Sequence, residues 1–305
     1  MTNDGSGDNR LSKNQRREDA REKARILRED QKKKDRRNRF LLQGSLVVVV
    51  IAIVAIVGLV IVNSVKPPSP GPLNMLSDGI KIGQGYKAVP TAALAPNAAP
   101  VPSSTNASNV IDIKVYVDYQ CPVCGTFEST NIGQIKTWVQ SGAATFEIHP
   151  IAILDSSSLG KKYSTRSANA AACVANYSPN NYFDFSAQLF ADQPKEGTEG
   201  LTDAQLANLA KGAKVTKLDS ISSCIRDQTF KSWVTAATTR ATTGPIPGSN
   251  VKKVEGTPTV IINGKKYLGA VGDATAFAAA VVQASGDSFS KNSSATPTPS
   301  PTATP

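Results

Sequence analysis

An uncharged apolar run near the start of the chain constrains its organisation more than any other feature. Residues 40–62 read FLLQGSLVVVVIAIVAIVGLVIV. As an α-helix rising about 1.5 Å per residue, this run is long enough to cross the roughly 30 Å hydrocarbon core of a bilayer. It also lacks the polar stripe that a surface helix of a soluble domain shows. We therefore expect residues 40–62 to form a transmembrane helix.

A cleaved signal peptide is the competing interpretation of this run. Such a peptide has a short basic start, an apolar core of about 7–15 residues and a cleavage site of small residues. Here 39 residues precede the run, the run itself is longer, and the sequence VNSVKPP that follows is a poor cleavage site. These departures favour a retained signal-anchor.

Basic residues beside the run predict how the anchor is oriented. Residues 1–39 contain 14 Lys or Arg against 8 Asp or Glu, and so carry +6 of the formal net charge of +10. The cluster KKKDRRNR directly precedes the run, whereas Lys66 stands alone on its other side. Basic flanks stay in the cytoplasm, so we expect residues 1–39 to be a cytoplasmic tail that touches membrane lipid. We expect no nucleic-acid partner, and we place everything after the anchor outside the cytoplasm.

Composition divides the rest of the chain into three parts. Residues 63–78 are rich in Pro, Ser and Gly and predict a linker. Residues 287–305 include SATPTPSPTATP, which predicts a disordered Ser/Thr/Pro tail. Residues 79–286 between them have the size of an ordinary domain, with a helical insertion predicted at about residues 159–243.

Strand and helix patterns in this domain predict an α/β fold. Residues 110–117 are rich in β-branched side chains and residues 145–149 alternate polar and apolar, so both predict strands. The sequence PTVIING at residues 258–264 predicts another strand that ends in a hairpin turn. The middle is helical and includes a capping box at Thr202 and Gln205. The order β-α-β, several helices, then β-β-α is that of one small sheet with a helical insertion.

Two cysteines separated by two residues are the strongest chemical signal. Cys121 and Cys124 follow the predicted strand in VYVDYQCPVCGTFE, and all four cysteines lie beyond the anchor, where disulfides persist. Zinc would require further ligands at matching spacing, but Cys173 and Cys224 are 51 residues apart. A Cys–His hydrolase would have to use His149, the single histidine. We predict no metal site; an inert pair is the remaining alternative.

The position of the pair favours thiol–disulfide exchange. A cysteine in the first turn of a helix faces unpaired N–H groups and the positive end of the helix dipole, which lower its pKa. The second cysteine lies one turn further in and can resolve a mixed disulfide formed at the first. Pro122 suits the first helical position, where no N–H donor is needed.

These segments together resemble a known family. YQCPVCGTFE, GTPTVIING and the helical insertion between them resemble the DsbA-like thiol–disulfide oxidoreductases of the thioredoxin superfamily. EIHPIAILD, YSTRSANAAACVANY and LFADQPKEGTEGL look most like its membrane-anchored actinobacterial members. The resemblance covers about residues 76–286 and implies a thioredoxin-like fold. It also implies a nucleophile at Cys121 and a resolving thiol at Cys124.

The resemblance further implies a substrate-binding surface. Pro258 would be a cis-proline packed against the cysteine pair, although a Thr-Pro before a strand usually has a trans bond. The backbone of Thr257 would then pair with a substrate chain as an added strand does. Pro122 and Val123, between the cysteines, would meet the same substrate.

Two positions depart from the pattern of this family. Relatives often carry a histidine where this chain has Val123, which offers no charge to the thiolate. Many relatives also carry a buried acid six residues before the first cysteine, where this chain has Val115. Asp118 and Glu128 are the nearest acids. Each is either an aid to proton transfer or an ordinary cap or solvated side chain.

The other two cysteines predict a structural disulfide. Cys173 and Cys224 lie in separate predicted helices of the insertion, and Cys224 shares an apolar face with Ile221 and Ile225. In the chain-entropy picture, closing a loop of this length stabilises the fold by roughly 4 kcal/mol. Two buried free thiols and a second redox pair are the alternatives.

Together these features predict a membrane-anchored oxidoreductase that oxidises cysteine pairs in exported unfolded or reduced polypeptides. The resemblance implies re-oxidation by a quinone-linked membrane partner of the DsbB or vitamin K epoxide reductase type. No cofactor is implied, since both electrons stay on sulfur. A reductase or isomerase could use the same site. A tethered peptide-binding or holdase module is the alternative from another class.

Overall fold

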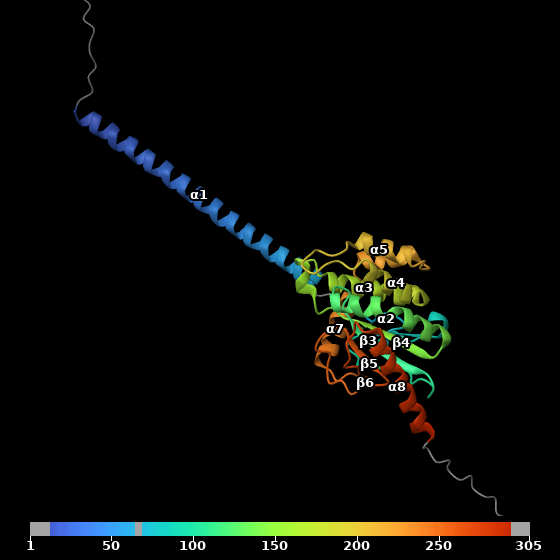
Figure 1. Ribbon diagram of the computed structural model, residues 1–305. Coiled ribbons are helices and arrows are strands. Elements are labelled where there is room, and N and C mark those ends of the chain that lie inside the picture. Colours follow the sequence, from blue (N-terminus) through green and yellow to red (C-terminus); the bar gives the residue numbers. More distant parts are fainter. Residues whose placement is uncertain (1–12, 65–68, 294–305) are drawn as a thin grey trace, which may run out of the picture. The chain divides into compact units, whose positions relative to one another are not determined.

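A computed structural model describes residues 13–64 and 69–293 of the chain, which divide into two units, Met1–Pro67 and Pro68–Pro305. In the first unit, α1 (Lys13–Ser64) is one continuous helix (Figure 1). It contains the one segment of the described residues that is long and apolar enough to cross a membrane, with a mean hydropathy of 2.9. Parts of the predicted tail, linker and C-terminal segment, at residues 1–12, 65–68 and 294–305, lie outside the described residues.

In the described part of the second unit, six strands form one sheet in the order β2-β1-β4-β3-β5-β6. The central strands β3 and β4 run parallel, and every other neighbouring pair is antiparallel. Strands β3 to β6 give the β-α-β and β-β-α order expected from the sequence, and β1 and β2 extend the sheet beyond β4. The strands are β1 (Ile80–Gly83), β2 (Lys87–Ala88), β3 (Ile111–Val117), β4 (Ala144–Pro150), β5 (Thr259–Ile262) and β6 (Lys265–Lys266).

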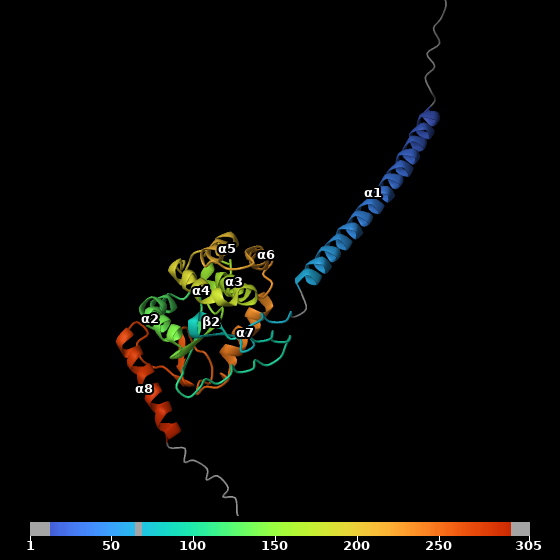
Figure 2. The same cartoon turned by 90° about the vertical axis from the view of Figure 1, so that its right-hand side faces the viewer.

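One face of the sheet carries the main hydrophobic core. Side chains alternate along β3, so Val115 and Val117 enter this core. There they join Phe127 of α2 (Pro122–Ser141) and Phe277 of α8 (Ala274–Ser293), whose rings lie 5.4 Å apart. Figure 2 shows α2 and α8 side by side beneath the insertion. The core therefore fixes α2, and with it the cysteine pair, against the end of β3.

The insertion between β4 and β5 is helical, as predicted. Its capping box is confirmed: the Thr202 hydroxyl accepts from the Gln205 N–H, and the Gln205 side chain accepts from the Thr202 N–H. Within residues 69–293, three short 3₁₀ turns also occur: Gln84–Tyr86, Asp155–Ser158 and Pro179–Asn181. The helices are α3 (Tyr163–Tyr177), α4 (Tyr182–Ala191), α5 (Asp203–Gly212), α6 (Leu218–Arg226) and α7 (Lys231–Thr243).

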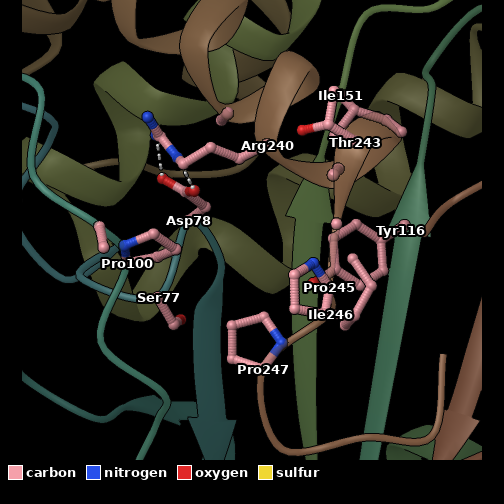
Figure 3. Close-up of a pocket in the computed structure, with 14 residues that line it drawn as sticks. Ser77, Asp78, Pro100, Tyr116, Ile151, Arg240, Thr243, Pro245, Ile246 and Pro247 are labelled. Atoms are coloured by element: carbon pink, nitrogen blue, oxygen red, sulfur yellow. Dashed lines mark hydrogen bonds and ion pairs between the residues drawn. The ribbon is translucent and has the colours of Figure 1, made fainter. Parts of the chain in front are cut away.

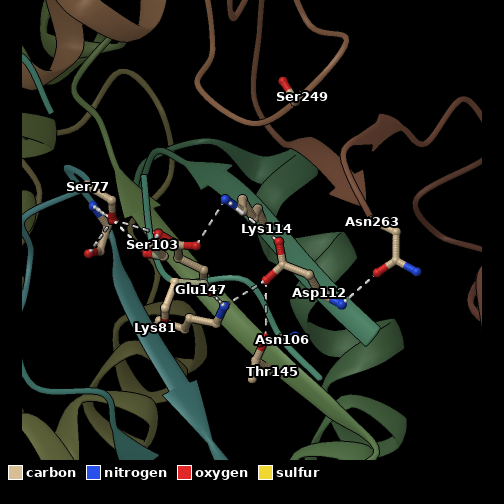
Figure 4. Close-up of polar contacts among 12 residues, drawn as sticks. Ser77, Lys81, Ser103, Asn106, Asp112, Lys114, Thr145, Glu147, Ser249 and Asn263 are labelled. Atoms are coloured by element: carbon tan, nitrogen blue, oxygen red, sulfur yellow. Dashed lines mark hydrogen bonds and ion pairs between the residues drawn. The ribbon is translucent and has the colours of Figure 1, made fainter. Parts of the chain in front are cut away.

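The other face of the sheet carries a buried ladder of charges (Figure 4). Lys81, Glu147 and Lys114 stand in register across β1, β4 and β3, and the Lys114 Nζ lies 3.3 Å from Glu147 Oε2. The hydroxyls of Ser77 and Ser103 each donate to Glu147 Oε1 at 2.6 Å. Burial alone would raise the pKa of Glu147, but His149 and Lys114 hold it well below its ordinary value. Glu147 therefore stays ionised as the centre of a structural network.

Two predicted boundaries are corrected. Residues 69–78, assigned to the linker by composition, pack on the domain. Met75 is fully buried, and Asp78 accepts two hydrogen bonds from Arg240 of α7, at 2.6 and 2.7 Å (Figure 3). Residues 287–293, assigned to a disordered tail, continue α8 to Ser293. In both segments, contacts or helix propagation outweigh a Pro/Ser-rich composition.

Candidate functional site

The cysteine pair lies at the start of α2, shortly after the end of β3. Cys121 is the N-cap of α2 with an extended backbone, and Pro122 occupies the first helical position. Both Cys121 and Cys124 are free thiols. Cys121 is 6% exposed and Cys124 is completely buried. The first thiol can therefore be reached from the surface, and the second only through the first.

The two thiols differ strongly in acidity. A hydrogen bond from Cys124 lowers the pKa of Cys121 from 9.0 to about 6, and the N–H groups of Val123 and Cys124 at the helix N-terminus act in the same direction. Burial raises the pKa of Cys124 well above its ordinary value, and the neighbouring Cys121 adds to the rise. Near neutral pH the pair therefore holds a thiolate at the outer position and a thiol at the inner one.

The Thr257-Pro258 dipeptide lies against this pair. The peptide bond between the two residues is cis. In its protonated form, the Cys121 thiol donates to the Thr257 carbonyl oxygen at 3.2 Å, which brings together groups 136 positions apart in the sequence. The Thr257 hydroxyl is buried, makes no hydrogen bond of ordinary length, and lies close enough to the thiols to contribute to the lowered pKa of Cys121. Pro122 and Val123 are exposed beside Cys121, so all four predicted substrate-facing residues meet at one end of the sheet.

The two nearby acids occupy different environments. Asp118 is sealed, and its oxygens accept hydrogen bonds from the backbone N–H groups of Gln120, Ile153 and Leu154, each at 2.9 Å. It therefore ties the cysteine loop to the segment after β4. Burial raises the pKa of Asp118 to about 6 and that of Glu128 to about 7. Glu128 lies on the inner face of α2 with Cys124.

A residue of the insertion, Gln193, also reaches the site, and sequence reasoning missed it. Its Nε2 donates to the carbonyl oxygens of Tyr119 and Cys121, at 3.1 and 2.9 Å. Its Oε1 faces the backbone at Gly125, where an added Cβ would lie 2.4 Å away. Gln193 lies within LFADQPKEGTEGL. No local sequence pattern, however, predicts that a glutamine in a loop will hydrogen-bond to the backbone of an active site.

We expect Gly125→Ala to be coupled to Gln193. The new methyl group would push the flexible Gln193 amide away, losing two hydrogen bonds of about 1 kcal/mol each. The better helix propensity of alanine would offset at most about 1 kcal/mol. In a Gln193→Ala background no clash remains, so the same change should stabilise the fold. Urea unfolding of the four proteins measures this double-mutant cycle; equal effects of Gly125→Ala in both backgrounds would contradict the contact.

The remaining sequence-predicted residues lie away from the dithiol. Cys173 of α3 and Cys224 of α6 are joined in a buried disulfide with Cα atoms 5.9 Å apart. His149 points to the charged face of the sheet, where its ring stacks on Tyr116 at 4.3 Å between centroids. Cys121 belongs to the core on the opposite face. This placement argues against a Cys–His hydrolase.

A cavity of about 310 Å³ also lies apart from the cysteines (Figure 3). Tyr116, Ile151 and Ile246 form its apolar wall, and the Asp78–Arg240 pair closes one side. None of the four cysteines lines it. Among the residues that the structure describes, no group of three or more His, Cys, Asp or Glu is placed to hold a metal ion.

The sheet, the insertion and the dithiol at a helix N-terminus define a thioredoxin-fold protein of the DsbA type. A family model described as thioredoxin matches residues 103–281, more than half of the chain. The chain therefore belongs to the thioredoxin family. The predicted fold and the resemblance to DsbA-like oxidoreductases are confirmed.

Solved structures agree with this assignment. The reduced form of the disulfide bond oxidoreductase DsbG from Mycobacterium tuberculosis is 27% identical, with a TM-score of 0.52, over 72% of this chain and 95% of that one. Oxidised BdbD from Bacillus subtilis, at 18% identity and a TM-score of 0.50, covers 72% of this chain and 100% of its own, and shares the fold.

Curated relatives match over shorter stretches. The serine/threonine-protein kinase PknE of Mycobacterium tuberculosis is 36% identical over 117 residues, which are 36% of this chain and 21% of the kinase. The chain thus spans about a fifth of the length of that relative. Disulfide bond formation protein D of Bacillus subtilis is 25% identical over 156 residues, 51% of this chain and 64% of that protein.

Proposed function

We propose that this protein is a membrane-anchored, extracytoplasmic thiol–disulfide oxidoreductase that oxidises cysteine pairs in exported polypeptides. The observation that carries the proposal is the asymmetric dithiol at the start of α2. Cys121 is accessible and acidic, whereas Cys124 is sealed and weakly acidic. Such a pair can accept attack at the outer sulfur and keep the inner one out of contact with substrate.

The reaction follows from this geometry. A substrate thiolate attacks the Cys121 Sγ within the Cys121–Cys124 disulfide, and Cys124 leaves and takes up a proton. The substrate, now held to Cys121, can pair its backbone with that of Thr257. Its second thiolate attacks the substrate sulfur of the mixed disulfide, and Cys121 leaves as a thiolate. The substrate has lost two electrons and the enzyme dithiol has gained them.

The acidity of Cys121 supports the oxidising direction. A lowered pKa stabilises the dithiol form relative to the disulfide and makes Cys121 a good leaving group. Val123 supplies no charge to this thiolate, so the stabilisation comes from Cys124, from Thr257 and from the helix N-terminus. A quinone-linked membrane oxidase of the DsbB or vitamin K epoxide reductase type would remove the two electrons. The apolar part of α1 would hold the domain at the membrane, with the basic residues before it in the cytoplasm.

Cys124→Ala is expected to trap client proteins on Cys121. The Cys121 thiolate of the variant attacks a client disulfide, one client sulfur leaves as a thiolate, and Cys124, which would release the client by attacking Cys121, is gone. Cells carrying the variant are treated with acid and alkylated, and Cys121 adducts are separated on non-reducing gels. The Cys121→Ala/Cys124→Ala protein is the matched control and should trap nothing. If Cys124→Ala traps no client yet still binds unfolded chains, the protein is a holdase module.

The same cells decide the direction of the wild-type reaction. In the resting state of an oxidase, Cys121 and Cys124 form a disulfide, and an alkylating reagent does not label them. A reductase rests as the dithiol, and an isomerase requires a dithiol in order to attack wrong disulfides. Labelling of both thiols in most of the wild-type molecules would overturn the oxidase assignment and leave the oxidoreductase assignment in place.

A further inference from the structure

One side chain of the helical insertion binds the backbone that carries the nucleophilic cysteine. Gln193 lies two residues past the end of α4, where its own N–H donates to the Phe190 carbonyl oxygen at 3.3 Å. A residue that precedes a proline is disfavoured in the helical region, and Pro194 follows Gln193. The chain therefore leaves α4 at this point, and the Gln193 amide bonds to the loop before α2.

The helix that carries Gln193 is itself fixed to the same loop. The Tyr119 hydroxyl lies 3.2 Å from the Tyr182 hydroxyl and 3.1 Å from the Ser186 hydroxyl, and both partners belong to α4. In the last turn of α4, the Phe190 ring lies 5.0 Å from the Tyr119 ring. These contacts attach α4 to Tyr119, and the Gln193 amide extends the attachment to Cys121.

The peptide groups on both sides of Cys121 are held by hydrogen bonds. The Cys121 N–H donates to the Asp118 carbonyl oxygen at 3.0 Å, within the loop itself. The Cys121 carbonyl oxygen accepts from the Gly125 N–H at 3.2 Å and from the Gln193 amide at 2.9 Å. The first bond of the pair closes the opening turn of α2, and the second joins that turn to the insertion.

The position of this backbone determines how well the Cys121 thiolate is stabilised. The Cys124 thiol makes the largest contribution to the lowered pKa of Cys121, and Thr257 and the N–H groups of Cys124 and Val123 add to it. Hydrogen bonds weaken steeply when their distance or angle departs from the optimum. A displaced Cys121 backbone would therefore turn its sulfur away from these donors and weaken the thiolate.

The residues between the cysteines do not relax this requirement. They are Pro122 and Val123, and neither carries a charge that could stabilise a thiolate over a wide range of sulfur positions. Stabilisation by short hydrogen bonds depends on geometry to a much greater degree than stabilisation by a charge. The acidity of the nucleophile thus depends on whatever fixes its backbone.

We propose that Gln193 is a positioning residue that keeps Cys121 at the N-cap of α2, so that the helical insertion sets how strongly the pair oxidises. This inference rests on the proposed function. A Gln193 with a structural role alone would stabilise the fold and leave the chemistry of the thiols unchanged.

The test measures the chemistry of Cys121 in the purified full chain. Gln193→Met keeps a side chain of similar length but removes the N–H donor. Iodoacetamide labelling of the reduced protein between about pH 4 and 9 reports the acidity of Cys121. We expect the pH of half-maximal rate to move from near 6 in the wild-type protein to about 7 in the variant, because the Cys124 thiol still donates while the backbone N–H groups are misaligned.

The equilibrium with glutathione gives a second readout. Two glutathione thiols reduce the Cys121–Cys124 disulfide, and the products are the enzyme dithiol and oxidised glutathione, so two electrons pass to the enzyme. The Cys121 thiolate favours the dithiol side of this equilibrium. With the expected loss of acidity, the equilibrium constant of Gln193→Met at pH 7 should be about fivefold lower than that of the wild-type protein.

Gln188→Met is the matched control. Gln188 is a half-buried glutamine of α4, and its Oε1 lies 2.6 Å from the place that a Cβ atom on Gly212 would occupy. It therefore meets a glycine of α5 as Gln193 meets Gly125 of α2. The control removes a glutamine amide from the same helical insertion, so it should keep the wild-type alkylation profile and glutathione equilibrium whatever it does to urea unfolding.

Gly125→Ala tests the same contact without a change at Gln193. The added methyl group would lie 2.4 Å from the Gln193 Oε1 and displaces the amide. We expect the alkylation profile of this variant to move in the same direction as that of Gln193→Met. In a Gln193→Ala background the methyl group has nothing to displace, and Gly125→Ala should cause no additional shift.

The outcomes are distinct. A folded Gln193→Met protein with the wild-type profile and equilibrium overturns the proposal, and so does an equal shift in Gln188→Met. A shift in Gln193→Met that Gly125→Ala does not reproduce also overturns it, because both changes remove the same two hydrogen bonds. If the wild-type protein forms no disulfide from oxidised glutathione, the proposed function fails instead, and the alkylation profiles still test the position of Cys121.

Discussion

Cys121→Ser is expected to lower thiol–disulfide exchange by about 1000-fold or more, the largest effect of any single substitution in this protein. The oxygen nucleophile is not ionised near neutral pH and forms no disulfide, so neither half of the reaction remains. Serine is close to cysteine in size, and Cys121 lies at the helix N-cap, where serine is favoured. The fold should therefore persist. Oxidation of a reduced, unfolded client protein measures the loss, and thermal unfolding verifies the fold.

The pH dependence of alkylation provides the matching positive result. Iodoacetamide should label Cys121 with a rate that is half-maximal near pH 6, because the pKa of its thiol is lowered to about 6. Cys124→Ala removes the largest cause of that lowering, so its profile should move to higher pH. By linkage, the thiolate stabilises the reduced fold fully above about pH 9, and this contribution is lost as pH falls through 6. A wild-type profile centred near pH 9 would show that the thiolate is not stabilised.

Local signals made much of this site predictable from the sequence. The predicted strand, the CxxC pair and Pro122 at the first helical position all lie within about fifteen residues. Short-range preferences alone therefore predict their geometry. Thr202 and Gln205 do the same for the start of α5. Asn263 and Gly264 both have positive φ angles between β5 and β6, as an Asn-Gly hairpin turn requires. In each case a short-range preference and the tertiary fold point the same way.

The unpredicted features depend on contacts between distant parts of the chain. Gln193 donates a hydrogen bond to the carbonyl oxygen of Cys121, which lies 72 positions earlier in the sequence. No periodic pattern in the sequence predicts such a contact. Composition assigned residues 69–78 to a linker, because the partner that orders them, Arg240, lies 162 positions from Asp78.

Removing the Cys173–Cys224 disulfide is expected to cost about 4 kcal/mol in the free energy of unfolding, the largest stability effect we predict. The two cysteines are 51 positions apart, and an open loop of that length regains its conformational entropy when the chain unfolds. The test compares urea unfolding of the oxidised wild-type protein with that of Cys173→Ala/Cys224→Ala. Substitution is preferable to chemical reduction, because a reductant would also reduce Cys121 and Cys124.

The folded double variant also distinguishes a structural disulfide from a second redox pair. The bond joins α3 to α6 within the insertion, and Cys173 and Cys224 are 0% and 4% exposed, so burial opposes attack by a client thiolate while the fold persists. Exchange through Cys121 should therefore continue at the wild-type rate at temperatures where the variant remains folded. A variant that is folded but fails to oxidise clients would instead show that electrons pass through Cys173 and Cys224. A stability loss under about 1 kcal/mol would mean that packing of the insertion, and not the disulfide, holds these two helices together.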